Sequence, residues 1–186
     1  MFKYWQVISP GHPGNRAGRY LCAMNYFELF GLPVTLEVDK QGLSQKYFAL
    51  QKQFHPDFFT REDDDAQNAA LEQSSMINKA LKVLQHRDET IKYVLGLKGM
   101  LEEEEKYSLP QDFLMEMLEL NEKALEVEPE AFRNEVEGLE GNLYDEIREI
   151  VETYNDATTS EADLLKVKEY YFKKKYLHRL LDRLDD

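Results

Sequence analysis

The sequence predicts an all-α protein in which a helical hairpin is followed by a three-helix bundle. Helix-breaking residues are sparse, with six prolines and nine glycines among 186 residues. Apolar side chains recur every three or four positions over long stretches, which is the period of an amphipathic helix. The hydrophobic fraction of 42% is ample for a folded core.

The first half predicts four helices and one loop. Gly31 stops a short apolar helix, and Asp39 is the expected N-cap of a longer one. Pro56 ends that longer helix because proline disfavours helical geometry at the residue before it. The helices are expected over residues 24–30, 39–54, 63–85 and 90–97, with the loop over 55–65. The expected buried positions of the two long helices are Leu43, Tyr47, Leu50, Phe54, Ala70, Ile77, Ala80, Leu81 and Leu84.

The second half predicts three longer amphipathic helices. The acidic run Glu102–Glu105 and Pro110 mark a boundary before them. Because their connections are short, we expect an antiparallel bundle. The helices are expected over residues 111–126, 130–154 and 161–184. We therefore divide the chain into a leader (1–23), a first domain (24–99), a linker (100–110) and a bundle (111–186).

Composition excludes several classes of function. A net charge of −13 argues against a nucleic-acid-binding protein, which needs a basic face. The single cysteine, Cys22, can form neither an internal disulfide nor a paired-thiolate zinc site. The sequence has no uncharged apolar run long enough to span a membrane. We expect no cofactor and no metal site.

Residues 1–23 differ from the rest of the chain. They carry Lys3, Arg16 and Arg19 without any acid. We expect a disordered or non-native leader. The alternative is a mitochondrial presequence, which is also basic and poor in acids.

The tripeptide His55-Pro56-Asp57 follows a helix that carries Lys46 and Lys52. By itself it could be an ordinary helix-ending turn. A catalytic His–Asp pair is also conceivable, although neighbouring residues do not easily orient each other and no activated nucleophile is evident. Proline stiffens the loop, so both side chains would be presented without a large entropy cost on binding.

This region resembles the J-domain family. Besides the tripeptide, Tyr26–Gly31 (YFELFG) is similar to the opening segment of that family, and Ile77–Ala80 (INKA) is similar to its third-helix signature. The resemblance implies that His55, Pro56 and Asp57, with Lys46 and Lys52, bind a chaperone ATPase. J-domains usually place lysine after the tripeptide. Here Phe58 and Phe59 follow, which we expect to narrow the choice of chaperone.

The helix expected over residues 111–126 has two apolar stripes. One consists of Phe113, Met117, Leu120 and Ala124. The other consists of Leu114, Met115, Leu118 and Leu125, interleaved with Glu119 and Glu122. Because a bundle member needs to bury only one stripe, the second is either a docking surface or a sign of deeper burial.

Residues 24–186 as a whole resemble the HscB/Jac-type co-chaperones of iron–sulfur cluster assembly. Phe113–Leu120 (FLMEMLEL) is similar to the scaffold-binding helix of that family. The resemblance implies that an IscU-type scaffold protein is contacted by Leu114, Met115, Leu118, Glu119, Glu122 and Tyr176. Ordinary core packing is the alternative role for Tyr176.

The predicted function is therefore a co-chaperone, not an enzyme. It would stimulate a DnaK/HscA-type ATPase and deliver the scaffold to it. The alternatives are a J-domain protein for another client and a helical interaction module. Eukaryotic relatives often add a cysteine-paired zinc module, which this chain lacks, so we expect a bacterial, cytoplasmic form, or a mitochondrial-matrix protein if residues 1–23 are a presequence. We expect a monomer, with self-association through the second stripe as the alternative.

Overall fold

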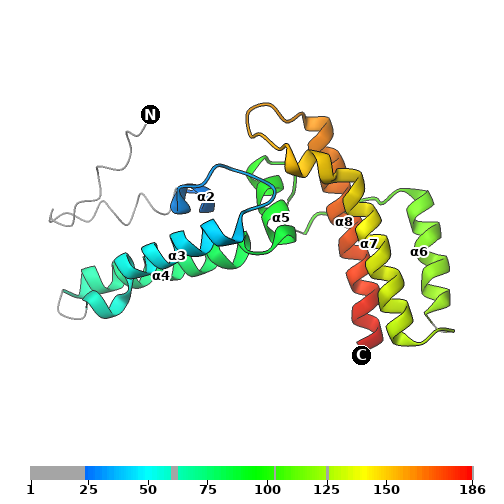
Figure 1. The fold of residues 1–186 in the computed structure, drawn as a ribbon, viewed down its shortest axis with the longest axis horizontal. Helices are drawn as coiled ribbons and strands as arrows, with labels where there is room; N and C mark the ends of the chain where they lie inside the picture. The colour runs from blue at the N-terminus through cyan, green and yellow to red at the C-terminus, as the bar shows by residue number, and fades with distance from the viewer. Residues whose placement is uncertain (1–23, 60–62, 103, 125, 186) are drawn as a thin grey trace. The chain divides into compact units, whose positions relative to one another are not determined.

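The computed structural model describes residues 24–59, 63–102, 104–124 and 126–185. The prediction for residues 1–23 falls outside this range. The described residues form helices and connecting turns without any strand, which confirms the all-α prediction (Figure 1). The helical elements are α2 (Tyr26–Phe30), α3 (Lys40–Phe54), the 3-10 turn η1 (Pro56–Phe59), α4 (Asp64–Leu84), α5 (Arg87–Leu97), α6 (Gln111–Lys123), α7 (Pro129–Glu152) and α8 (Glu161–Asp185).

Side-chain caps fix the beginnings of α2, α3 and α4. Asn25 and Glu28 form a reciprocal capping box, in which each side chain accepts a hydrogen bond from the backbone N–H of the other residue. The carboxylate of Asp39 accepts from the N–H of Gly42 at 2.7 Å, as expected for the predicted N-cap. Asp63 caps α4 in the same way, through the N–H of Ala66 at 2.8 Å.

Several boundaries differ from the prediction. α6 ends at Lys123, three residues earlier than expected, and α7 ends at Glu152, two residues earlier. α5 begins at Arg87, three residues earlier than expected. Its first turn is held by Thr90, whose buried hydroxyl donates to the carbonyl of His86 at 3.0 Å. The predicted loop also contains the short 3-10 turn η1, which begins at Pro56.

The described chain divides into two compact units. One consists of described residues up to Leu32 together with Ser44–Leu81, and the other of Pro33–Leu43 together with the described residues from Lys82 onwards. α5 thus groups with α6–α8. The predicted first domain ends at residue 99 and the predicted bundle begins at residue 111. These boundaries were drawn from sequence signatures, whereas the two units are defined by contacts, so the predicted domains stay a prediction.

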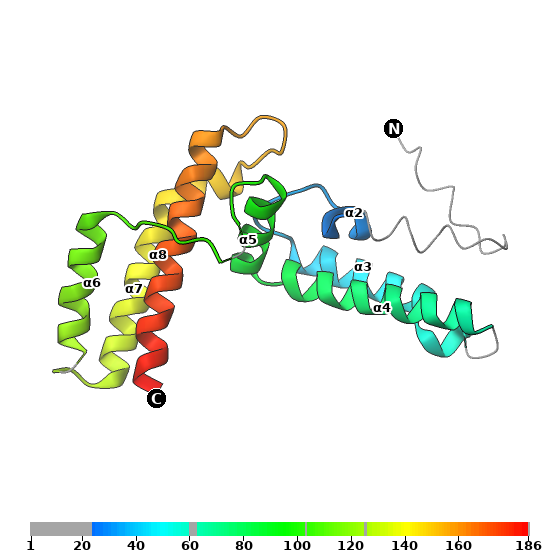
Figure 2. The same ribbon diagram turned by 180° about the vertical axis from the view of Figure 1, so that it is seen from behind.

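In the first unit, α3 and α4 lie side by side as a hairpin, which both views show (Figures 1 and 2). The Asn78 side chain links them, accepting from the Tyr47 hydroxyl at 3.0 Å and from the Gln51 amide at 2.9 Å. Of the expected core positions, Leu43, Ala70, Ile77, Ala80 and Leu84 are buried, whereas Tyr47, Leu50, Phe54 and Leu81 are only half-buried.

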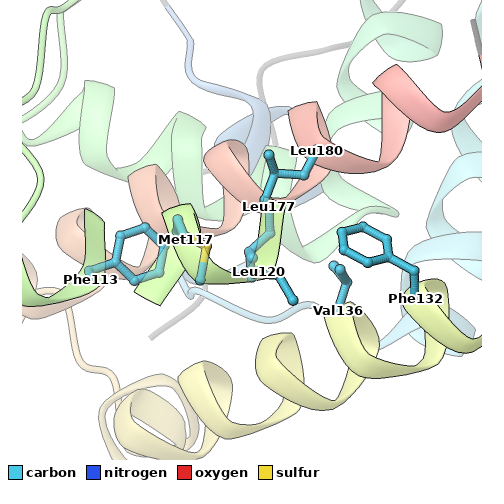
Figure 3. Close-up of a cluster of buried hydrophobic side chains, with 7 residues drawn as sticks. All are labelled: Phe113, Met117, Leu120, Phe132, Val136, Leu177 and Leu180. Carbon is cyan, nitrogen blue, oxygen red and sulfur yellow. The ribbon is translucent and has the colours of Figure 1, made fainter. Parts of the chain in front are cut away.

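In the second unit, α6, α7 and α8 form the predicted bundle around one apolar cluster (Figure 3). The cluster joins Phe113, Met117 and Leu120 of α6 to side chains from the other two helices. Burying them removes apolar surface from water, at roughly 25 cal/mol per Å². The buried members are Phe113, Met117, Leu120, Phe132, Val136, Leu177 and Leu180.

The middle of α8 buries a wider face than its predicted stripe. Val167, Tyr170 and Phe172 are buried, whereas the apolar pattern in the sequence of this helix consists of Leu164, Tyr171, Leu177, Leu180, Leu181 and Leu184. The reason is that α8 packs against α5, α6 and α7. A helix with neighbours on several sides has to bury more than a single stripe.

The predicted linker packs onto α8 through two contacts. Lys168 forms an ion pair with Glu105 at 2.6 Å. The rings of Tyr107 and Phe172 are stacked, with centroids 4.5 Å apart. Residues 105–107 are thus attached to the bundle.

Candidate functional site

The tripeptide His55-Pro56-Asp57 lies on the surface, directly after the last residue of α3. The N–H of Phe58 donates to the carbonyl of His55 at 3.0 Å, which closes the η1 turn. The N–H of Asp57 donates to Nδ1 of His55 at 3.3 Å. When the imidazole is neutral, this bond leaves its proton on Nε2. The backbone therefore sets the orientation of the ring.

Both polar side chains of the turn are open to solvent. The exposed fractions are 47% for the His55 side chain and 82% for that of Asp57. Nδ1 of His55 lies 3.7 Å from the Asp57 carboxylate, which is longer than a hydrogen bond. The carboxylate is thus accessible from solvent. This geometry suits recognition by a partner protein better than proton transfer between the two groups.

The two lysines of α3 have different surroundings. A separation of six residues turns them about 120° apart around a helix. Nζ of Lys46 donates to the carbonyl of Gly31 at 2.5 Å, at the end of α2. Lys52 is exposed in the last turn of α3, close in sequence to the tripeptide. Lys52 is thus better placed than Lys46 to add positive charge beside the loop.

α6 carries its two apolar stripes on different sides. Phe113, Met117 and Leu120 are buried in the bundle. Leu114, Met115 and Leu118 are exposed by 40%, 64% and 61%. Deeper burial therefore does not account for these three residues. The side chain of Leu125, the fourth member of the second stripe, lies outside the described residues.

Acidic side chains accompany the exposed stripe. Glu119 and Glu122 are both exposed. On a helix, Met115 shares a face with Glu119 and Glu122 because these residues are four and seven positions away. The surface formed by Leu114, Met115, Leu118, Glu119 and Glu122 is called the α6 patch below.

Tyr176 does not belong to the open part of the α6 patch. It is half-buried and packs against the apolar cluster of the bundle. Its ring meets that of Phe113 edge to face, with centroids 6.0 Å apart. The packing role expected as the alternative for Tyr176 is thus present, and a contact with a scaffold stays a prediction.

No group of three or more histidine, cysteine, aspartate or glutamate side chains among the described residues could hold a metal ion. None of the described helices is both long and apolar enough to cross a membrane.

Comparison with known proteins identifies the family. Residues 109–185 match the HSCB C-terminal oligomerisation domain. The co-chaperone protein HscB homolog of Haemophilus ducreyi is 37% identical over 158 residues, which cover 81% of this chain and 90% of that protein. The chain belongs to the HscB family of co-chaperones.

Solved structures of HscB proteins have the same fold. The chaperone HscB from Vibrio cholerae matches with a TM-score of 0.66 and 28% identity, over 87% of this chain and 96% of that one. The human co-chaperone protein HscB matches with a TM-score of 0.74 over 97% and 95% of the two chains. At 24% identity, the human protein supports the fold alone. The predicted resemblance and the role of an HscB co-chaperone in iron–sulfur cluster assembly are thereby confirmed.

The exposure of two phenylalanines was not predicted, although Phe58 was already noted in the sequence for its place after the tripeptide. Phe48 on α3 and Phe58 in η1 are exposed by 69% and 66%. The sequence contains a signal for Phe48, because it falls outside the stripe of Leu43, Tyr47 and Leu50. The exposure of Phe58 could not be predicted, because a loop residue has no periodic pattern.

Proposed function

We propose that this HscB protein works by binding two partners at once. The His55-Pro56-Asp57 turn, together with Lys52 and Lys46, docks on a DnaK/HscA-type chaperone and stimulates its ATPase. The α6 patch, with Tyr176 beside it, binds an IscU-type scaffold. One observation supports the proposal, which is that His55 and Asp57 are exposed in a hydrogen-bonded turn at the end of α3.

The loop supplies the polar contacts of the chaperone interface. An exposed carboxylate is an acceptor for a cationic group, and a bond between charged groups is stronger than a neutral one. Since Pro56 and the η1 hydrogen bond already order the turn, little entropy is lost on docking. Lys52 adds an electrostatic attraction to an acidic surface, which raises the association rate.

The α6 patch supplies the apolar contacts of the scaffold interface. Leu114, Met115 and Leu118 are long, flexible side chains that can adapt to a partner. Glu119 and Glu122 form an acidic rim that favours a basic partner surface. Self-association through the same patch would compete with the scaffold, and a monomer is the state that leaves the patch free.

Binding both partners raises the scaffold's effective concentration at the chaperone. A tethered pair can reach millimolar effective concentrations without any new contact. Delivery of the scaffold to a chaperone whose ATPase is stimulated at the same time would assist cluster transfer. This mechanism needs no enzymatic activity or cofactor in the co-chaperone itself. A cytoplasmic location fits the bacterial relatives.

The test is the steady-state ATPase rate of a DnaK/HscA-type chaperone with added wild-type protein or the His55→Gln variant. We expect the wild type to stimulate hydrolysis and the variant to have lost that stimulation, because Gln cannot reproduce the imidazole's contacts. Since His55 is exposed, the variant should fold normally, which circular dichroism would check. Equal stimulation by both proteins would contradict the role of the loop.

A further inference from the structure

Phe48 and Phe58 are the two most exposed large apolar side chains among the described residues, at 69% and 66%. Single exposed apolar residues are common on protein surfaces and need no explanation. These two, however, belong to the elements that form the candidate chaperone surface. Phe48 is on α3, and Phe58 directly follows Asp57 in η1.

Phe58 is held in a defined place beside the tripeptide. Its N–H donates to the carbonyl of His55, and its ring meets the His55 ring edge to face, with centroids 6.0 Å apart. The aromatic ring therefore stands next to the imidazole. A partner that reaches His55 comes within contact distance of Phe58 as well.

Phe48 extends the same surface along α3. It precedes Lys52 by four residues, so the two side chains are neighbours on one face of the helix. The ring of Phe48 meets that of Tyr47 edge to face, with centroids 5.7 Å apart. From α3 into η1, the surface thus offers a phenylalanine, a lysine, a histidine and a second phenylalanine.

We propose that Phe48 and Phe58 determine which chaperone this protein activates. The two rings would contact the docking surface of the chaperone. In the cognate chaperone, this surface has acidic groups opposite Lys52 and apolar side chains opposite the two rings. This inference is based on the proposed chaperone docking and adds that apolar contacts decide which chaperone is bound. Rigid aromatic side chains carry much of the binding energy in protein interfaces, whereas exposed charges act mainly on association rate and specificity.

The test titrates the chaperone ATPase with the full-length chain and its Phe58→Lys and Phe48→Ala variants. We expect Phe58→Lys to raise the concentration for half-maximal stimulation about tenfold, as for the loss of a central aromatic contact. The maximal stimulated rate should stay within about twofold, because the tripeptide that triggers hydrolysis is intact. Phe48→Ala should raise the same concentration to a smaller extent.

Two further variants keep the outcomes apart. Leu165→Lys makes the same kind of change at a half-exposed leucine of α8, and it should leave the titration unchanged. His55→Gln should remove the stimulation altogether. If His55→Gln is inactive while Phe58→Lys titrates like the wild type, Phe58 does not determine the choice of chaperone. The proposal that the tripeptide docks on the chaperone is then still supported. If His55→Gln stimulates fully, the docking proposal fails, and this inference fails with it.

It also matters whether a variant changes the maximal ATPase rate or the concentration for half-maximal stimulation. A Phe58→Lys variant that lowers the maximal rate without shifting the half-maximal concentration would overturn the inference, because Phe58 would then only orient His55. A shift that is equally large for Leu165→Lys would overturn it too, because added charge anywhere would suffice. Melting curves of all variants check that the folds are comparable.

Discussion

Replacing Met115 and Leu118 by alanine should weaken scaffold binding while leaving the fold intact. Full burial of a leucine or methionine side chain is worth about 1.5–3 kcal/mol. Leu118 has 61% of its surface exposed, so a partner that covers it could gain about 1–2 kcal/mol from this residue. That range corresponds to about a 5- to 30-fold change in Kd. Met115, at 64% exposure, has a similar capacity.

The assay is isothermal titration of the protein with a purified IscU-type scaffold. We expect each single alanine variant to raise Kd by about 5- to 30-fold and the double variant to raise it further. Stability should change by less than about 0.5 kcal/mol, because neither side chain is buried. Leu165→Ala on α8, where the leucine is 51% exposed, is the matched control.

Two results would refute the reasoning. An unchanged Kd for the double variant would mean that the α6 patch does not contact the scaffold. An equal loss of affinity for Leu165→Ala would mean that binding responds to any exposed leucine. In either case the exposed stripe would need another occupant, and self-association could be measured by sedimentation.

Three other predictions follow from the fold. Met117→Ala should destabilise the bundle by about 2–5 kcal/mol in chemical denaturation, because Met117 is 1% exposed within the apolar cluster; a loss below about 1 kcal/mol would contradict its place in the core. Asn25→Ala should cost about 1 kcal/mol by removing the capping box of α2, whereas Asn25→Asp should retain most of that stability. The hydrogen bond from Lys98 lowers the pKa of Asp156, so the stability that Asp156 contributes is present above its ordinary pKa and is lost as the pH falls through the lowered value. The stability difference between wild type and Asp156→Asn should therefore shrink below about pH 4, and a difference that grows there would show the opposite sign.

The sequence predicted the helices well because their signals are local. Asp39 and Asp63 precede the helices they cap, and the apolar period of α7 marks its buried side. The exposed stripe of α6 was visible for the same reason, since one helix needs only one buried face. Such features depend on residues that are near one another in the sequence.

Other features depend on contacts that no local pattern contains. Arg87, in the first turn of α5, forms an ion pair at 2.6 Å with Glu37, fifty residues earlier. Its guanidinium also lies over the ring of Tyr144, 4.2 Å from the centroid. The amine of Lys46 reaches the carbonyl of Gly31, fifteen residues earlier, and its predicted contact with a chaperone stays a prediction. These pairings are set by packing, and only the structure reveals them.

The most direct test of the account measures ATPase stimulation with chaperone, co-chaperone and scaffold together. We expect wild-type protein plus scaffold to exceed the stimulation by either one alone. The Met115→Ala/Leu118→Ala variant should keep its own stimulation and lose the added effect of the scaffold. If that variant still shows the full added effect, the α6 patch does not deliver the scaffold and the two-partner mechanism is wrong.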